Sequence, residues 1–67
     1  MRPRESVAVD GQGRVFVANG QIFQYAPDGQ LVGRIDVPER PLQVIFGGEN
    51  GRTLFVLTHH SLYAVTP

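Results

Sequence analysis

The sequence contains no cysteine, which excludes both disulfides and thiolate metal sites. Its six basic and six acidic residues cancel, and no cluster of lysine or arginine indicates a nucleic-acid partner. No apolar run approaches the roughly 20 residues of a membrane-spanning helix. The polar start, MRPRESVAV, is unlike a signal peptide. We therefore expect no nucleic-acid or membrane partner, and these absences favour a cytoplasmic product.

The length of 67 residues allows one small domain, which buries a modest fraction of its surface. Chains of this size usually need disulfides, a metal or partner chains for stability. Since disulfides are excluded, the remaining means are a metal held by oxygen or histidine ligands, or assembly with other copies or with further sequence.

Short runs of β-branched and aromatic residues fill the chain, and turns that contain glycine separate them, which is typical of consecutive strands. We predict strands at residues 6–10, 14–18, 21–25, 30–37, 42–46, 53–57 and 62–65. Asn19-Gly20 predicts a type I′ hairpin turn. APDGQ predicts a type I turn with a bulge, with Gly29 in the left-handed position. Pro38 and Pro41 mark a connection between strands.

The second half of the chain repeats the pattern of the first. The similar pairs are Val7 and Val44, Val15 and Leu54, Phe16 and Phe55, Val17 and Val56, Ile22 and Leu62, and Phe23 and Tyr63, at offsets of 37 to 40 residues. Four strands in about 40 residues are typical of a propeller blade. The sequence therefore predicts an all-β fold that is a single propeller segment over residues 1–67: one four-stranded blade at about 5–37 and three strands of a second blade at about 42–66. A small two-sheet sandwich is the alternative, but it leaves the repeat unexplained.

Two blades alone would leave apolar faces uncovered. We expect these faces to be completed either by the remaining blades of a longer protein or by a homo-oligomer. Three copies related by cyclic symmetry would give six blade positions.

The runs PDGQLVGRIDVPERP, FGGENGRTLFVLT and SLYAV resemble the C-terminal blades of the gluconolactonase/regucalcin family of sugar lactonases. RESVAVDGQGRVFVA resembles the start of a blade in that family, and the likeness runs from about residue 4 to residue 66. The resemblance implies a six-bladed propeller with a divalent cation, often calcium or zinc, near its axis. It also implies metal-dependent hydrolysis of a sugar lactone. Glu5 stands where the family carries a metal-bound aspartate, and Gln43 stands where members tend to carry asparagine. The family's other metal ligands come from earlier blades.

Blade geometry places several polar residues at the rim that carries the family's active site. These are Glu5, Asn19, Glu39, Arg40, His59 and His60. We predict Glu5 as a metal ligand, since carboxylates bind hard cations, and Glu5, His59 and His60 as catalytic groups. Asn19, Glu39 and Arg40 are the candidate substrate-binding residues, although Asn19 also suits a turn and Glu39 could pair with Arg40. The predicted function is a sugar-lactonase site in the completed ring, and the alternative is a non-catalytic scaffold or interaction module.

Overall fold

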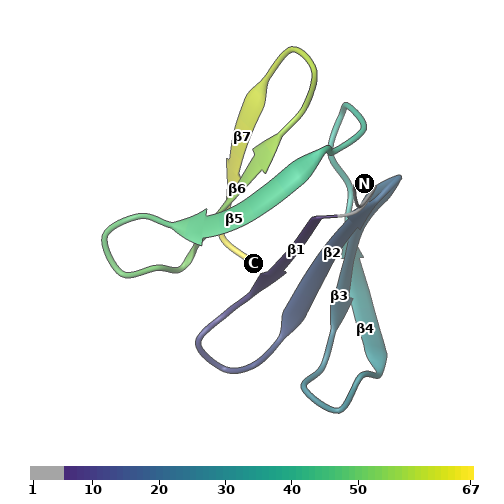
Figure 1. The fold of residues 1–67 in the computed structure, drawn as a ribbon, viewed down its shortest axis with the longest axis vertical. Coiled ribbons are helices and arrows are strands. Elements are labelled where there is room, and N and C mark those ends of the chain that lie inside the picture. The colour runs from purple at the N-terminus through teal and green to yellow at the C-terminus, as the bar shows by residue number, and fades with distance from the viewer. Residues whose placement is uncertain (1–5) are drawn as a thin grey trace.

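The computed structural model describes residues 6–67, which form two antiparallel sheets (Figure 1). The strands are β1 (Ser6–Val9), β2 (Val15–Asn19), β3 (Gln21–Tyr25), β4 (Leu31–Ile35), β5 (Gln43–Gly47), β6 (Thr53–Leu57) and β7 (Leu62–Val65). Their order is β1-β2-β3-β4 in one sheet and β5-β6-β7 in the other. The predicted all-β class, with four strands followed by three, is confirmed. Residues 6–67 include no helix long and apolar enough to cross a membrane.

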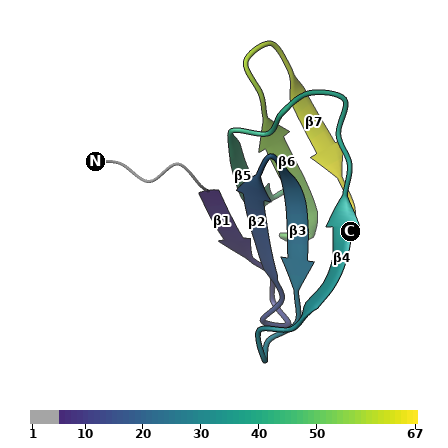
Figure 2. The same ribbon diagram turned by 90° about the vertical axis from the view of Figure 1, so that its right-hand side faces the viewer.

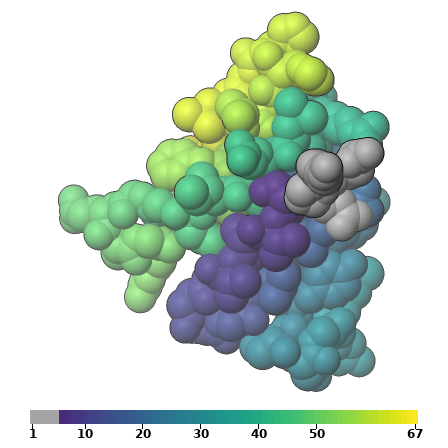
Figure 3. Space-filling view, viewed as in Figure 1, coloured from purple at the N-terminus to yellow at the C-terminus, as the bar shows by residue number. Residues whose placement is uncertain are grey.

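The two sheets meet along their first strands, β1 and β5 (Figures 1 and 2). The Ser6 hydroxyl accepts a hydrogen bond from the Val44 amide (3.1 Å) and lies 3.4 Å from the Val44 carbonyl oxygen. Figure 3 shows the atoms of β1 and β5 in direct contact at this junction. A single serine therefore provides a polar link between strands that belong to different sheets.

The core lies between the sheets because alternate residues of each strand point to the same side. Phe16, Ile22, Leu54 and Val56 are fully buried there. The ring of Phe46 meets Phe16 edge to face, with centroids 5.2 Å apart. Burial of several large side chains in one layer supplies most of the stability of such a small fold.

The opposite faces of both sheets stay uncovered by residues 6–67. On the four-stranded sheet, Val7 and Val9 are 55% and 57% exposed. On the three-stranded sheet, Ile45 and Leu62 are each 65% exposed, and Leu57, which is 44% exposed, pairs with Leu62 in the strand register. This arrangement, two packed sheets that each expose an apolar outer face, is the one expected of two neighbouring propeller blades.

Two turns test the sequence predictions. In APDGQ the Gly29 amide donates to the Ala26 carbonyl (2.8 Å) and Gly29 has a φ of 92°, as predicted. The predicted type I′ turn at Asn19-Gly20 is wrong, because only Gly20 has a positive φ, of 76°. The reason is the strand register: Asn19 pairs with Gln21, so the chain reverses around a single glycine.

The fourth strand is shorter than the predicted 30–37. Its ladder ends at Ile35, and beyond it the Val37 amide donates to the side-chain oxygen of Gln21 (3.0 Å). The Gln21 amide group returns a hydrogen bond to the Val37 carbonyl oxygen (3.4 Å). The Gln21 side chain thus takes the place of a strand backbone as the hydrogen-bond partner of Val37.

The central strands β2 and β6 have the same alternation of half-buried and buried residues. This alternation matches Phe16 with Leu54 and Ala18 with Val56, at an offset of 38 residues. The repeat alignment predicted from the sequence, which matches Phe16 with Phe55, is shifted by one residue. Phe16 faces the core, whereas Phe55 lies on the face of its sheet that points away from the core. Because side chains alternate along a strand, a shift of one residue reverses the face.

Candidate functional site

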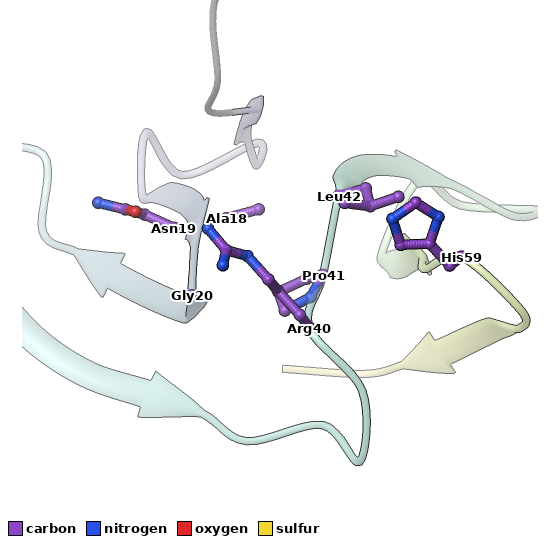
Figure 4. Close-up of a pocket in the computed structure, with 7 residues that line it drawn as sticks. All are labelled: Ala18, Asn19, Gly20, Arg40, Pro41, Leu42 and His59. Carbon is purple, nitrogen blue, oxygen red and sulfur yellow. The ribbon is translucent and has the colours of Figure 1, made fainter.

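A cleft of about 320 Å³ lies where the connection between the two sheets passes the turns at the ends of β2 and β6. Its lining, drawn in Figure 4, consists of Ala18, Asn19, Gly20, Arg40, Pro41, Leu42 and His59. Pro41 is buried and fixes φ at its position, which anchors the connection. The Leu42 amide donates to the Leu57 carbonyl (2.8 Å) and ties the connection to β6.

Three of the predicted site residues line this cleft, each from a different segment. Arg40 extends from the connection toward the β2–β3 turn, and His59 stands beside Leu42 (Figure 4). Asn19 lies at the end of β2 with its side-chain amide directed away from Arg40 (Figure 4). The arrangement offers a guanidinium, an imidazole and an amide at the rim of a partly apolar hollow.

Glu39 lies beside the cleft and does not line it. Its carboxylate accepts hydrogen bonds from three hydroxyl groups of the β6–β7 hairpin: Thr58 to Oε1, Ser61 to Oε2 (3.1 Å) and Tyr63 to Oε2 (3.4 Å). The hydroxyl of the buried Thr58 also accepts from the amides of Ser61 (3.0 Å) and His60 (3.3 Å). Glu39 therefore fastens the connection to the hairpin, and it is not bound to Arg40.

These hydroxyls stabilise the ionised form of Glu39. The Thr58 hydrogen bond holds the pKa of Glu39 below its ordinary value, and it outweighs partial desolvation, which raises the pKa. Hydrogen bonds from Ser61 and Tyr63 and the charge of His60 act in the same direction as Thr58. A carboxylate stabilised by several donors remains ionised at neutral pH.

The other predicted site residues are placed differently. Glu5 lies outside the described residues. His60 follows His59 in the hairpin turn and lies outside the cleft; the two ring centroids are 6.3 Å apart and the rings are tilted by 55°. In the described part of the chain, no three His, Asp or Glu side chains gather in a way that could hold a metal ion. Residues 6–67 alone therefore do not fit the divalent cation that the resemblance implies.

The hydroxyl groups of Thr58, Ser61 and Tyr63 are not among the site residues predicted from the sequence. A threonine three residues before a serine, at the end of an apolar strand, is a recognisable turn signal, and the Thr58 amide does donate to the Ser61 carbonyl (2.9 Å). Their joint contact with Glu39, 19 to 24 residues away in sequence, carries no such local signal.

A second hollow lies between the sheets at the opposite rim, and residues of the β1–β2 turn, the β5–β6 turn and the C-terminal end line it. Arg14 and Arg52 line it, and the Arg14 guanidinium lies 2.6 Å from the Asp10 carboxylate. Partial burial raises the pKa of Asp10, but hydrogen bonds from Arg14 and Gln12 outweigh it, so this pKa lies below its ordinary value. None of the predicted site residues within 6–67 lines this hollow.

The described strands and their order define a pair of propeller blades with a polar cleft at one rim. Residues 4–60 match the family model of the SMP-30/gluconolactonase/LRE-like region, and the chain belongs to this family. It is 38% identical over 63 residues to a gluconolactonase of Zymomonas mobilis, which covers 91% of this chain and 18% of that protein. It is also 38% identical over 56 residues to a 6-deoxy-6-sulfogluconolactonase of Pseudomonas putida, which covers 78% of this chain and 19% of that protein. No solved structure matches. The chain thus spans about a fifth of the length of these curated relatives.

Proposed function

We propose that this chain supplies part of a sugar-lactone site and that hydrolysis requires the completed propeller. The observation that supports the proposal is the meeting of Asn19, Arg40 and His59 at one cleft, in a chain that belongs to a family with gluconolactonase members. Lactone opening adds water to the ring carbonyl carbon and breaks the bond from that carbon to the ring oxygen. The water loses a proton, and the ring oxygen gains one.

The cleft residues suit parts of this reaction. Arg40 and Asn19 carry N–H groups that can donate hydrogen bonds to sugar oxygens. His59 is exposed at the cleft, and a ring nitrogen of histidine can accept the proton of the attacking water. We propose Glu5 as this chain's contribution to a cation site, with the other ligands supplied by further blades.

The open faces of the two sheets are the reason for requiring further blades. Exposed Val7 and Val9 on one side and Ile45 and Leu62 on the other are surfaces that blade packing would cover. Three copies of this chain, or the remaining blades of a longer chain, would supply the cover. The native mass, measured by light scattering, distinguishes these two arrangements.

The proposed activity is tested by following the opening of D-glucono-1,5-lactone in a pH-stat, with the native mass measured on the same sample. We expect a rate above the spontaneous rate only in an assembly larger than one chain. His59→Gln should lower the catalysed rate by about 100-fold or more, since a general base contributes at least that much. Arg34→Gln, an exposed change in β4, should leave the rate unchanged. A complete assembly with no catalysed rate would refute the proposal.

A non-catalytic scaffold is the second candidate. One observation favours it: the carboxylate of Glu39, a predicted substrate-binding residue, accepts hydrogen bonds from three hairpin hydroxyls and does not line the cleft. A titration with Ca²⁺ or Zn²⁺ separates the two functions. A rise in melting temperature that Glu5→Gln abolishes supports the lactonase, whereas an unchanged melting temperature in the assembled protein supports the scaffold.

A further inference from the structure

Glu39 and Arg40 are adjacent in sequence and carry opposite charges, yet the structure separates their interactions. Both oxygens of Glu39 accept hydrogen bonds from the β6–β7 hairpin. The ion pairs that the described residues form are Arg14 with Asp10 and Arg34 with Asp36. Within that part of the chain, the Arg40 guanidinium therefore has no carboxylate partner, and its positive charge remains available at the cleft.

The residues that line the cleft do not neutralise the charge of Arg40. Among the described residues, none of the seven that line the cleft is acidic, and Arg40 is the arginine among them. Ala18, Pro41 and Leu42 make the rest of the lining largely apolar (Figure 4). A guanidinium beside apolar surface is weakly hydrated and presents N–H groups in a fixed fork, which matches the oxygens of a phosphate, sulfonate or carboxylate.

The size of the hollow limits the ligand. Small-molecule pockets in proteins begin at about 300 Å³, and this cleft has about 320 Å³. One sugar ring with one charged substituent suits such a volume, whereas an oligosaccharide would extend beyond it. The ring would lie against Pro41 and Leu42, and the substituent would reach Arg40.

We infer that the ligand of this cleft is an anionic sugar, a single ring whose phosphate, sulfonate or carboxylate group is bound by Arg40. This inference rests on the proposed function in that it takes the same cleft as the sugar site, and it adds the charge of the substrate. An exposed charge pair improves binding by about two- to fivefold. The preference for an anionic over a neutral ring should have that size.

Matched stable ligands test the inference. D-glucose 6-phosphate and D-glucose share the ring and differ in the charged group, while inorganic phosphate carries the charge without the ring. Each is titrated into the ¹⁵N-labelled chain, and dissociation constants are taken from amide shifts. We expect glucose 6-phosphate to bind about two- to fivefold more tightly than glucose, to bind more tightly than phosphate, and to shift the amides of Gly20, Leu42 and His59.

Charge variants assign the preference to one residue. In Arg40→Gln the two sugars should bind equally, and Arg40→Lys should keep part of the preference because it keeps the charge without the fork. Arg52→Gln removes a positive charge from the opposite rim and should keep the whole preference.

The inference is overturned if the wild-type chain binds neither sugar, or binds glucose and glucose 6-phosphate equally. It is also overturned if phosphate binds as tightly as the sugar phosphate, or if Arg52→Gln lowers the preference as much as Arg40→Gln. The lactone assay separates this failure from failure of the proposed function. Catalysed opening of neutral gluconolactone without an anion preference would overturn the inference alone. Arg40-dependent binding of glucose 6-phosphate in an assembly that lacks catalysis would overturn the lactonase alone.

Discussion

Replacing Thr58 by valine should destabilise the fold, although the two side chains have nearly the same shape. Thr58 is 4% exposed, and its hydroxyl is the central group between Glu39 and the hairpin turn. Valine would remove the hydrogen bond to Glu39 and leave the Ser61 amide without its acceptor. The Ser61 amide and the Glu39 carboxylate are half-buried, and each lost hydrogen bond contributes about 0.5–1.5 kcal/mol. We therefore expect the free energy of unfolding to fall by about 1–3 kcal/mol for the two.

The assay is urea unfolding followed by far-ultraviolet circular dichroism, with thermal unfolding as a second measurement. For a domain of this size, 1 kcal/mol corresponds to roughly 4–8 °C in Tm. Thr66→Val makes the same chemical change at an exposed position and should stay within about 0.5 kcal/mol of the wild type. Hydrogen exchange at the Ser61 amide should accelerate only in Thr58→Val.

Equal stability of Thr58→Val and the wild type would refute this reasoning. So would an equal loss in Thr66→Val, because the effect would then come from the added methyl group. An unchanged m-value is required, since a change in m would indicate an altered unfolded state.

Three further predictions concern the same fold. Acidification should lower the urea midpoint, because the pKa of Glu39 is below its ordinary 4.5 in the folded state and the unfolded chain therefore takes up more protons as the pH falls. Glu39→Gln should make the decrease of the midpoint with pH less steep. An equally steep decrease in that variant would contradict the role of Glu39. Leu54→Ala should lower the free energy of unfolding by roughly 2–5 kcal/mol, because Leu54 is fully buried. Leu62→Ala should change it little, because Leu62 is 65% exposed. Similar losses for the two variants in urea unfolding would contradict the core described above. Gly20→Ala should lower the free energy of unfolding by about 1–2 kcal/mol, because alanine is disfavoured at the positive φ of this position, although the space around it is open. Gly11→Ala should cost less, because Gly11 also lies in open space and has no positive φ. Equal Tm values for the two variants would refute this difference.

The sequence was sufficient to predict seven strands because each has a local signal, a short apolar run closed by a turn. It failed at β4, where the Gln21 side chain takes over the pairing of Val37, and at Asn19, where the strand register overrides the usual preference of Asn-Gly. The repeat was read from residue similarity, which aligned Phe16 with Phe55. Burial matches Phe16 with Leu54, and only the paired strands contain that information.

For the candidate site, blade geometry was sufficient to predict that Asn19, Arg40 and His59 share one rim. It could not predict their separation from Glu39, because that depends on hydroxyl groups that become neighbours only after the hairpin docks against the connection. Glu39 and Arg40 looked like a pair because they adjoin. Hydrogen bonds to three donors from another segment outweigh that proximity.

The two uncovered sheet faces differ from each other, and this difference gives any assembly of such units a direction. The valine-lined face of the four-stranded sheet and the isoleucine- and leucine-lined face of the three-stranded sheet are not copies of one surface. If units join by these faces, front to back, the contact is heterologous and leaves one face of each kind unpaired at the ends. The rotation between neighbouring units then determines whether the assembly closes into a ring or grows into an open filament. A change in that rotation would therefore change the solubility of the assembly.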